Sequence, residues 1–404
     1  MNLSEELVWR GFANQTTYKD ISVLDGAPIS FYFGVDPSSD SMTIGNLASA
    51  MMVRHFINHG HNAYLLVGGA TGIIGDPDGK KDERNLKALD EIAHNKAGIA
   101  AQYKTVFDGK DFKIVDNYDW FKDINYIDFL REVGKNVPLS QMLSREFVQS
   151  RIGDDGSGIS YAEFSYALMQ GYDFVHLNRE FGVSLQLCGA DQWGNSIAGV
   201  DLIRRLEGRE AHVYSTNLVI NKTTGVKFGK TEGGAIWLDP NKTSVYAFYQ
   251  FWLNAGDADV IDWMKIFTLI PREQIEEYEA KAASNPGARE AQLALAEAVT
   301  TIVHGTERTQ SVQRVTAVLF GGADFSSLSA DDIETLAAEI PTAQVGMSLV
   351  DVLVSTETAS SNGDAKRLIE AASISINGQK VSEDQTVESV SLIKKGKNSF
   401  ILVR

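Results

Sequence analysis

Three polar residues in segment 161–177 are spaced as one stripe of a helix. Tyr166, Gln170 and Asp173 follow each other at i, i+4 and i+7, so a helix would present all three on one side. A stripe of phenol, amide and carboxylate differs from the apolar stripe of a core helix and from a solvated charged face. We predict that it lines a pocket for a small zwitterionic ligand.

The segment 32–47 could bind phosphate. Short polar residues and Gly45 stand where an expected helix would present its unpaired N–H groups after an expected strand. Gly45 would also let a flat base lie against the backbone. A capped helix after a turn is the alternative interpretation, and the segment by itself favours it.

The glycine-rich loop 68–81 is not a standard nucleotide motif. A Walker A sequence requires glycine where Ile74 stands and serine or threonine where Lys81 stands, and the dinucleotide spacing is also absent. Asp76 could hold a ligand ammonium group at the end of a strand. An ordinary turn aspartate is the alternative.

Two later segments complete the set. Asp191, among small residues of segment 186–195, suits a pair of ribose hydroxyls, and Gln186 and Gln192 could hydrogen-bond a polar substrate. The segment 227–231 (KFGKT) places two lysines in a glycine loop, where they could stabilise charge that develops in a transition state. Each signal is weak alone, but five at one rim of a sheet indicate an active site.

The elements that position these residues alternate between strand and helix. Residues 29–35 and 63–67 are expected strands, and a helix ending at Gly60 separates them, which predicts a parallel crossover. Segments 184–187 and 212–220 supply further strands. We predict an α/β fold with a doubly wound, parallel, Rossmann-like sheet that binds ligands beyond the carboxyl ends of its strands.

The chain divides into parts of different character. We expect a Rossmann-like catalytic domain at 1–220 with a helical insertion at about 85–175, and an α-helical domain at 221–320 that begins with the KFGKT loop. Helices are expected at 244–253, 260–268, 272–283 and 288–303. A linker at 321–346 precedes a small α+β module at 347–404.

Composition limits the class of protein. The chain has 404 residues, 44% of them apolar, so it can bury a large core, and the net charge of −16 argues against nucleic-acid binding by the whole surface. Residues 347–404 carry seven basic and seven acidic side chains, so this module is the better place for a polyanion. One cysteine, Cys188, and no long apolar run predict a cytoplasmic protein without a metal site or membrane span.

Together the motifs resemble the bacterial tyrosyl-tRNA synthetases, which are class I aminoacyl-tRNA synthetases. Residues 43–46 stand at the HIGH signature and 227–231 at the KMSKS loop in its KFGKT form. Segments 68–84 and 189–195 and the stripe of Tyr166, Gln170 and Asp173 are similar to the tyrosyl family in particular. The last 58 residues resemble the S4 RNA-binding fold through segments 364–370 and 376–379.

The resemblance implies tyrosine–tRNA ligation: ATP, accompanied by Mg²⁺, activates L-tyrosine to an adenylate, which then charges tRNA-Tyr. It also implies a homodimer formed through the inserted helices. The implied tyrosine site has Tyr32 and Asp173 on the phenol. It has Asp76, Tyr166 and Gln170 on the ammonium group with Gln192 nearby, and Gln186 as a further contact to the substrate. The implied ATP residues are Gly34, Asp36, Gly45, Asn46, Gly189, Asp191 and Lys230, and the implied catalytic residues are Ser38, Thr43, Asn46, Lys80, Arg84, Lys227, Lys230 and Thr231.

The sequence departs from the HIGH signature at both histidines. Thr43 replaces the first histidine and Asn46 the second, and threonine is shorter and never cationic. Our hypothesis is that phosphate stabilisation shifts to Ser38, Lys227 and Lys230. Phe33 stands where some members have a ribose-contacting cysteine, so a sugar contact there would have to come from the backbone.

Three alternatives stay open. A tryptophanyl-tRNA synthetase shares the fold but does not need a phenol-binding pair. A nucleotidyltransferase that is not a synthetase would leave the S4-like tail unexplained. A catalytically silent, synthetase-like RNA-binding protein would fit the missing histidine at position 43.

Overall fold

The protein is described by a computed structural model. It describes residues 1–404 except 77–86, 153–156, 218, 220–229 and 232–233. Two compact units form: residues 1–243 with 251–303, and residues 244–250 with 304–404. Each is described by itself.

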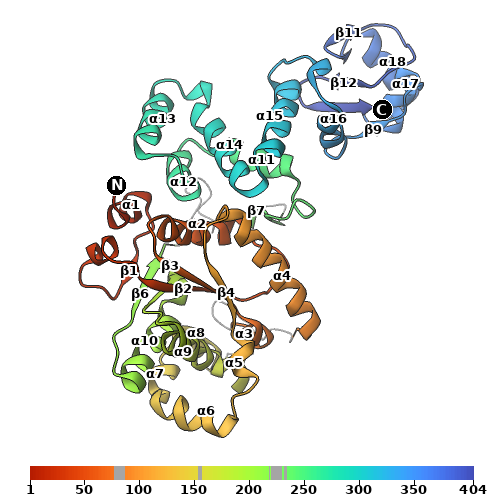
Figure 1. The fold of residues 1–404 in the computed structure, drawn as a ribbon. Helices are drawn as coiled ribbons and strands as arrows, with labels where there is room; N and C mark the ends of the chain where they lie inside the picture. Colours follow the sequence, from red (N-terminus) through yellow and green to blue (C-terminus); the bar gives the residue numbers. More distant parts are fainter. Residues whose placement is uncertain (77–86, 153–156, 218, 220–229, 232–233) are drawn as a thin grey trace. The chain divides into compact units, whose positions relative to one another are not determined.

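A six-stranded sheet forms the centre of the first unit. Its order is β1-β6-β5-β2-β3-β4, with β2 to β6 parallel and β1 antiparallel to β6 at one edge (Figure 1). Continuous apolar sequence in the central strands suits burial on both faces. The predicted α/β fold with a parallel sheet is confirmed. The strands are β1 (Gln15–Thr16), β2 (Ser30–Val35), β3 (Asn62–Val67), β4 (Lys113–Asp116), β5 (Leu185–Gly189) and β6 (His212–Thr216).

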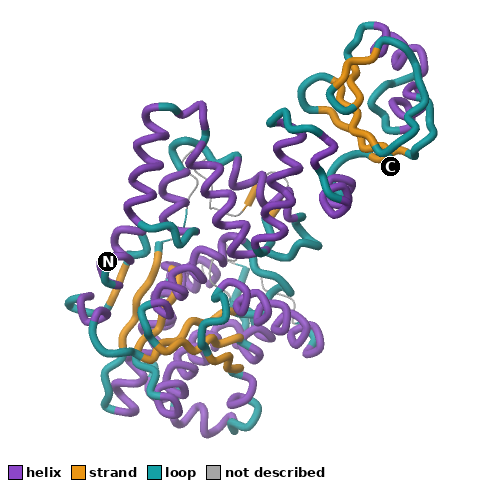
Figure 2. Tube along the Cα trace, turned by 45° about the horizontal axis from the view of Figure 1, so that its top comes forward, coloured by secondary structure: helices purple, strands orange, loops and turns teal. Residues whose placement is uncertain are grey.

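Helices cover both faces of this sheet (Figures 1 and 2). On one face α2 (Ile44–Asn58) packs on the strands, and the rings of Phe31 and Phe56 lie 5.3 Å apart. On the other face lie α9 (Tyr161–Phe181) and α10 (Trp193–Glu207), and the ring of Tyr32 lies 5.1 Å from that of Phe174. Alternate residues of β2 therefore belong to different cores. The other α-helices that precede α9 in the chain are α1 (Leu3–Arg10), α3 (Gly69–Ile74), α4 (Leu89–Val106), α5 (Tyr118–Phe121), α6 (Tyr126–Glu132), α7 (Leu139–Leu143) and α8 (Glu146–Ile152).

Segment 85–175, expected as a helical insertion, differs from that expectation in one respect. It contains β4, which pairs in parallel with β3 and extends the sheet by one strand. Only Ile114 and Val115 are apolar in this four-residue edge strand, so the pattern is too short to be distinguished from a loop.

The four helices expected between 244 and 303 are present with similar bounds. They are α11 (Val245–Leu253), α12 (Val260–Phe267), α13 (Arg272–Ser284) and α14 (Glu290–His304). The hairpin strands β7 (Lys230–Thr231) and β8 (Gly234–Ala235) precede them.

The second unit contains a five-stranded sheet of order β11-β10-β12-β13-β9. Segment 321–346, expected as a linker, contributes α16 and the strand β9, which pairs in parallel with β13. Leu336 of α16 packs with Leu319 and Leu402, because the apolar positions of this short helix recur at helical spacing. The elements are α15 (Thr306–Phe320), α16 (Ala330–Ala337), β9 (Thr342–Ala343), α17 (Leu349–Ser355), α18 (Asn362–Glu370), β10 (Ile374–Ile376), β11 (Gln379–Val381), β12 (Ser391–Lys395) and β13 (Ser399–Val403).

Within the described ranges, no helix combines the length and the apolar character that a membrane crossing requires.

Candidate active site

The loops that follow β2, β3 and β5 lie at one edge of the sheet. These three strands are parallel neighbours, so their carboxyl ends coincide. The loop after β2 carries Asp36 and Ser38, the segment after β3 carries Asp76, and the loop after β5 carries Asp191 and Gln192. The fold therefore brings three of the predicted segments to the same rim.

Tyr32 and Asp173 lie in the same buried layer. Each is 1% exposed, Tyr32 on β2 and Asp173 on α9, and both elements contribute to the core on that face. The hydroxyl of Tyr32 has no hydrogen-bond partner among the described residues. Burial raises the pKa of Tyr32 well above its usual value, and the nearby Asp173 carboxylate raises it further. A neutral phenol next to a carboxylate is thus left with unused hydrogen-bonding capacity.

The Asp173 carboxylate is held by two N–H donors. Asn117 Nδ2 donates to Oδ2 and Trp120 Nε1 donates to Oδ1, each over 3.0 Å. Burial raises the pKa of Asp173 well above its usual range, while these two donors act in the opposite direction. Each carboxylate oxygen keeps a second lone pair, which a ligand hydroxyl could use.

Sequence reasoning missed Asn117 and Trp120. Both belong to the stretch that directly follows β4, and β4 itself was hidden inside the expected insertion. Polar residues at the end of a parallel strand would have been the signal, had the strand been recognised.

A chain of hydrogen bonds connects Asp173 to the residues after β2. Asn117 Nδ2 also donates to Thr71 Oγ1 (2.9 Å), and Thr71 Oγ1 donates to Asp36 Oδ1 (2.7 Å). The Tyr166 hydroxyl donates to the other oxygen of Asp36 over 2.8 Å. The structure thereby joins Tyr166, predicted for tyrosine, to Asp36, predicted for ATP.

Two glutamines have buried amide oxygens without partners. Gln170 Oε1 on α9 and Gln186 Oε1 on β5 accept no hydrogen bond from the described residues. Gln186 is 3% exposed and pairs in register with Tyr32, so both side chains stand on the same face of the sheet. Leaving a buried amide oxygen unpaired costs free energy, and a ligand with several N–H donors would remove that cost.

Asp76 and Gln192 meet across the rim. Gln192 Nε2 donates to Asp76 Oδ2 over 2.7 Å, and Asn195 Nδ2 donates to Gln192 Oε1 over 3.2 Å. Arg145 in turn binds Asn195 and the Gly194 carbonyl. The amide of Gln192 is therefore fixed with its N–H side toward the carboxylate, which places a negative charge at the rim.

At the start of α2, Thr43 and Asn46 bind each other. The Thr43 backbone N–H (2.9 Å) and hydroxyl (3.0 Å) both donate to Asn46 Oδ1. This is the helix cap that formed the alternative interpretation of the segment. Ser38, Gly45 and Asn46 are exposed beside it.

The predicted ribose residues surround the end of β5. A Cβ atom at Gly189 would lie 2.5 Å from Asp191 Oδ1, so the close approach of this carboxylate requires glycine there. Asp191 is exposed, as is Gly34 near the end of β2. Both positions are open to a ligand from outside.

Three of the predicted catalytic residues, Lys80, Arg84 and Lys227, lie outside the described residues. Lys230 and Thr231 are described as backbone of β7, where they pair with Ala235 and Gly234.

Comparison with known families accounts for almost the whole chain. Residues 24–321 match the model described as "tRNA synthetases class I (W and Y)". Residues 332–404 match "Tyrosine--tRNA ligase SYY-like C-terminal domain". The first match does not separate the tryptophan group from the tyrosine group, whereas the second is specific to tyrosine ligases.

Individual relatives agree. The chain is 44% identical to "Tyrosine--tRNA ligase 2" of Bacillus cereus over the full length of both proteins. It is 41% identical to "Tyrosine--tRNA ligase 1" of Enterococcus faecalis, with 100% of this chain and 99% of the relative covered. Among solved structures it resembles a C-terminally truncated mitochondrial tyrosyl-tRNA synthetase of Aspergillus nidulans, at 26% identity and a TM-score of 0.71 over 79% of this chain and 94% of the other. The chain belongs to the class I tRNA synthetases and, within them, to the tyrosine–tRNA ligase family.

Proposed function

We propose that this chain activates L-tyrosine with ATP and transfers it to the 3′ end of tRNA-Tyr. The observation that carries the proposal is the buried pair of Tyr32 and Asp173. The hydroxyl of Tyr32 has no partner within the described part of the chain, and two oriented N–H donors hold Asp173. Full-length similarity to tyrosine ligases supports it.

The pair selects a phenol because the phenol hydroxyl can donate one hydrogen bond and accept another. The substrate hydroxyl would donate to the Asp173 carboxylate and accept from Tyr32. Phenylalanine would fill the same volume but leave two buried polar groups unpaired. Selectivity therefore arises from the cost of desolvating the site without satisfying it.

The ammonium group of tyrosine would lie at the polar end of the slot. The amide oxygens of Gln170 and Gln186, which accept no hydrogen bond from any residue that the structure describes, are acceptors for its N–H donors. The Asp76 carboxylate beside Gln192 supplies negative charge. Tyr166 acts through Asp36, to which its hydroxyl is bound. Two amide oxygens and one carboxylate match the chemistry of an α-amino group.

Adenylate formation then needs positioning and charge stabilisation. The tyrosine carboxylate attacks the α-phosphate of ATP, the bond to the bridging oxygen breaks, and pyrophosphate leaves. A ribose hydroxyl of tRNA next attacks the acyl carbon and AMP leaves. Mg²⁺ enters with ATP as part of the substrate. The proposed nucleotide contacts are Gly34, Asp36, Gly45, Asn46, Gly189 and Asp191, and the proposed catalytic residues are Ser38, Thr43, Asn46, Lys80, Arg84, Lys227, Lys230 and Thr231.

We also propose a homodimer formed through the inserted helices. Large apolar side chains on α6, α7 and α9 are exposed in the single chain, and a second copy of the chain would bury them. These are Tyr126, Ile127, Leu139 and Tyr161. Sedimentation of the protein and of the variant Ile127→Glu tests this: the variant should sediment as a monomer.

Charging of tRNA serves translation, so the proposed location is the cytoplasm.

A pyrophosphate-exchange assay with each of the twenty amino acids tests the function. Exchange with tyrosine alone, followed by charging of bulk tRNA, is the expected result. Exchange with tryptophan would support the tryptophanyl alternative, and exchange with no amino acid would support the silent RNA-binding alternative. A tyrosine-dependent exchange without tRNA charging would favour a nucleotidyltransferase.

A further inference from the structure

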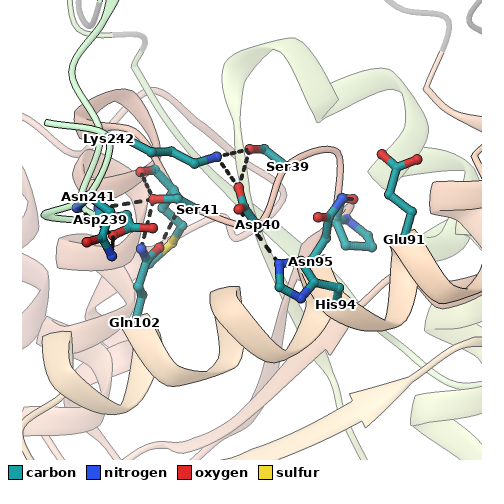
Figure 3. Close-up of polar contacts among 12 residues, drawn as sticks. Ser39, Asp40, Ser41, Glu91, His94, Asn95, Gln102, Asp239, Asn241 and Lys242 are labelled. Carbon is teal, nitrogen blue, oxygen red and sulfur yellow. Dashed lines mark hydrogen bonds and ion pairs between the residues drawn. The ribbon is translucent and has the colours of Figure 1, made fainter.

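An ion pair joins the loop after β2 to the segment after β8 (Figure 3). The Lys242 ammonium pairs with Asp40 Oδ1, lies 3.4 Å from Ser39 Oγ and stands 4.7 Å from the ring centre of Trp237. His94 Nε2 approaches the other oxygen of Asp40 at 3.8 Å. We refer to Asp40 and Lys242 as the clamp.

The backbones on either side of the clamp are also hydrogen-bonded. Ile44 N donates to Ile236 O (3.0 Å) and Leu238 N donates to Met42 O (2.9 Å), so the two segments form an antiparallel bridge at the start of α2. Asp239 N donates to Ser41 Oγ over 3.2 Å. The clamp thus ends a short strand-like contact.

The helix α4 holds the same loop from its other side. Gln102 Nε2 donates to Ser41 Oγ (2.8 Å), and its Oε1 accepts from Met42 N (2.7 Å). Asn95 Nδ2 donates to the Pro37 carbonyl over 3.0 Å. The loop is therefore a fixed support, to which the later segment is attached (Figure 3).

The attached segment continues directly into the hairpin that carries Lys230 and Thr231. Ala235 pairs with Lys230 in this hairpin, and the next residue, Ile236, accepts the hydrogen bond from Ile44. Two backbone pairings thus separate Lys230 from the start of α2. Ser38, which we predict to act on the phosphates, lies two residues before Asp40 of the clamp.

We propose that Asp40 and Lys242 are positioning residues for adenylate formation. They fix the register between the start of α2 and the segment bearing Lys230 and Thr231, so that the groups predicted to act on the phosphates converge. This inference rests on the proposed function.

The clamp contributes little to the stability of the fold, but it can affect the spacing of the catalytic groups strongly. The Lys242 and Asp40 side chains are 32% and 31% exposed, and ion pairs with this much solvent contact add little to the stability of a protein. A displacement of about 1 Å between catalytic groups, in contrast, lowers rates by a factor of ten or more. Loss of the clamp should therefore be detected in the rate of the chemical step before it is detected in thermal unfolding.

Single-turnover adenylate formation by the full chain tests the inference. The variants are Lys242→Met, Asp40→Asn, and the exchange of Asp40→Lys with Lys242→Asp in one chain. Each single variant should form adenylate about tenfold more slowly, with the tyrosine dissociation constant within about twofold of the wild-type value. The exchanged pair should recover part of the rate, because it restores an ion pair of opposite orientation.

The control is Lys281→Met, which makes the same substitution in the 2.8 Å pair of Lys281 with Glu290 on the helical segment. Its rate should equal that of the wild type. Unchanged rates in the clamp variants, or an exchanged pair slower than both singles, would overturn the inference. A wild-type chain without tyrosine-dependent exchange would contradict the proposed function instead, so the two failures are distinguishable.

Discussion

The side-chain amide of Asn117 donates to the carboxylate of Asp173 over 3.0 Å, across 56 positions of sequence. The same amide is fixed at its other end, because Asn117 Oδ1 accepts from the Ala70 backbone N–H over 2.7 Å. Asn117 is fully buried. The acid that we assign to the substrate phenol is therefore oriented by a residue that is itself held by the first turn of α3, the helix after β3.

This relationship predicts a large effect of Asn117→Asp. The change removes the N–H donor and places a second carboxyl group against Asp173, which disfavours the ionised form of both. Loss of a hydrogen bond to a charged group lowers tyrosine affinity by about 10- to 100-fold, measured by equilibrium dialysis. Asn178→Asp is the control, because that buried amide on α9 binds the Val183 carbonyl and not the slot. Equal losses in the two variants would contradict the assigned role.

Tyr32→Phe should lower the preference for tyrosine over phenylalanine. The variant deletes only the hydroxyl, so the slot keeps its shape while a phenylalanine ring leaves one fewer group unpaired. The ratio of kcat/KM for the two amino acids should fall about tenfold, as measured by pyrophosphate exchange. Tyr214→Phe is a matched control: its hydroxyl is also buried and has no partner among the residues described, but its ring packs on Phe56 at the opposite face. A fall in the control ratio would contradict the assignment.

Gln186→Met should change stability and activity in opposite directions. Methionine has a similar volume and removes the unpaired amide oxygen, so the unliganded chain should unfold at a higher urea concentration. The KM for tyrosine should rise about tenfold, since an acceptor for the ammonium group is lost. Gln292→Met provides the contrast, because Gln292 Nε2 donates to Asp257 over 2.7 Å and its loss should destabilise. A destabilised Gln186→Met chain would argue that the oxygen is satisfied.

Lys230→Ala should slow adenylate formation by about 100-fold in a single turnover. The reason is that position 43 provides no cationic side chain, and both donors of Thr43 are directed at Asn46. The tyrosine dissociation constant should stay close to the wild-type value. Lys281→Ala on the helical segment serves as control. An unchanged rate for Lys230→Ala would refute the shift of phosphate stabilisation to this lysine.

Acid sensitivity of the first unit should depend on Glu6. Burial raises the pKa of Glu6, but the contacts with His55 and Arg10 outweigh it and lower the value to about 2. A depressed pKa adds stability above the unfolded value of 4.5, and this stability is lost as the pH falls from about 4.5 toward 2. Between pH 6 and pH 3 the urea midpoint of Glu6→Gln should therefore fall less than that of the wild type. The exposed neighbour gives the control variant Glu5→Gln, which should keep the wild-type pH dependence.

The sequence by itself predicted the central fold and the helix that carries three of the candidate site residues. The apolar runs that became β2 and β3 can be buried on both faces only in a parallel sheet covered by helices, and the helix between them had to cross over. The spacing of Tyr166, Gln170 and Asp173 already required one helical stripe, and α9 includes all three. Local periodicity was sufficient for these because each depends on neighbours within a few turns.

The environment of the stripe was decided by the tertiary structure. Asn117 and Trp120 reach Asp173 only because β4 joins the sheet, and the four residues of that edge strand carry too little pattern to be recognised. The pairing of Tyr32 with Gln186 depends on β5 lying next to β2, although 153 residues lie between these two positions in the chain. Segment 321–346 likewise belongs to the core of the second unit because β9 pairs with β13. Such contacts are set by which strand pairs with which, and that choice is made by the packing of the whole unit and not by the residues on either side.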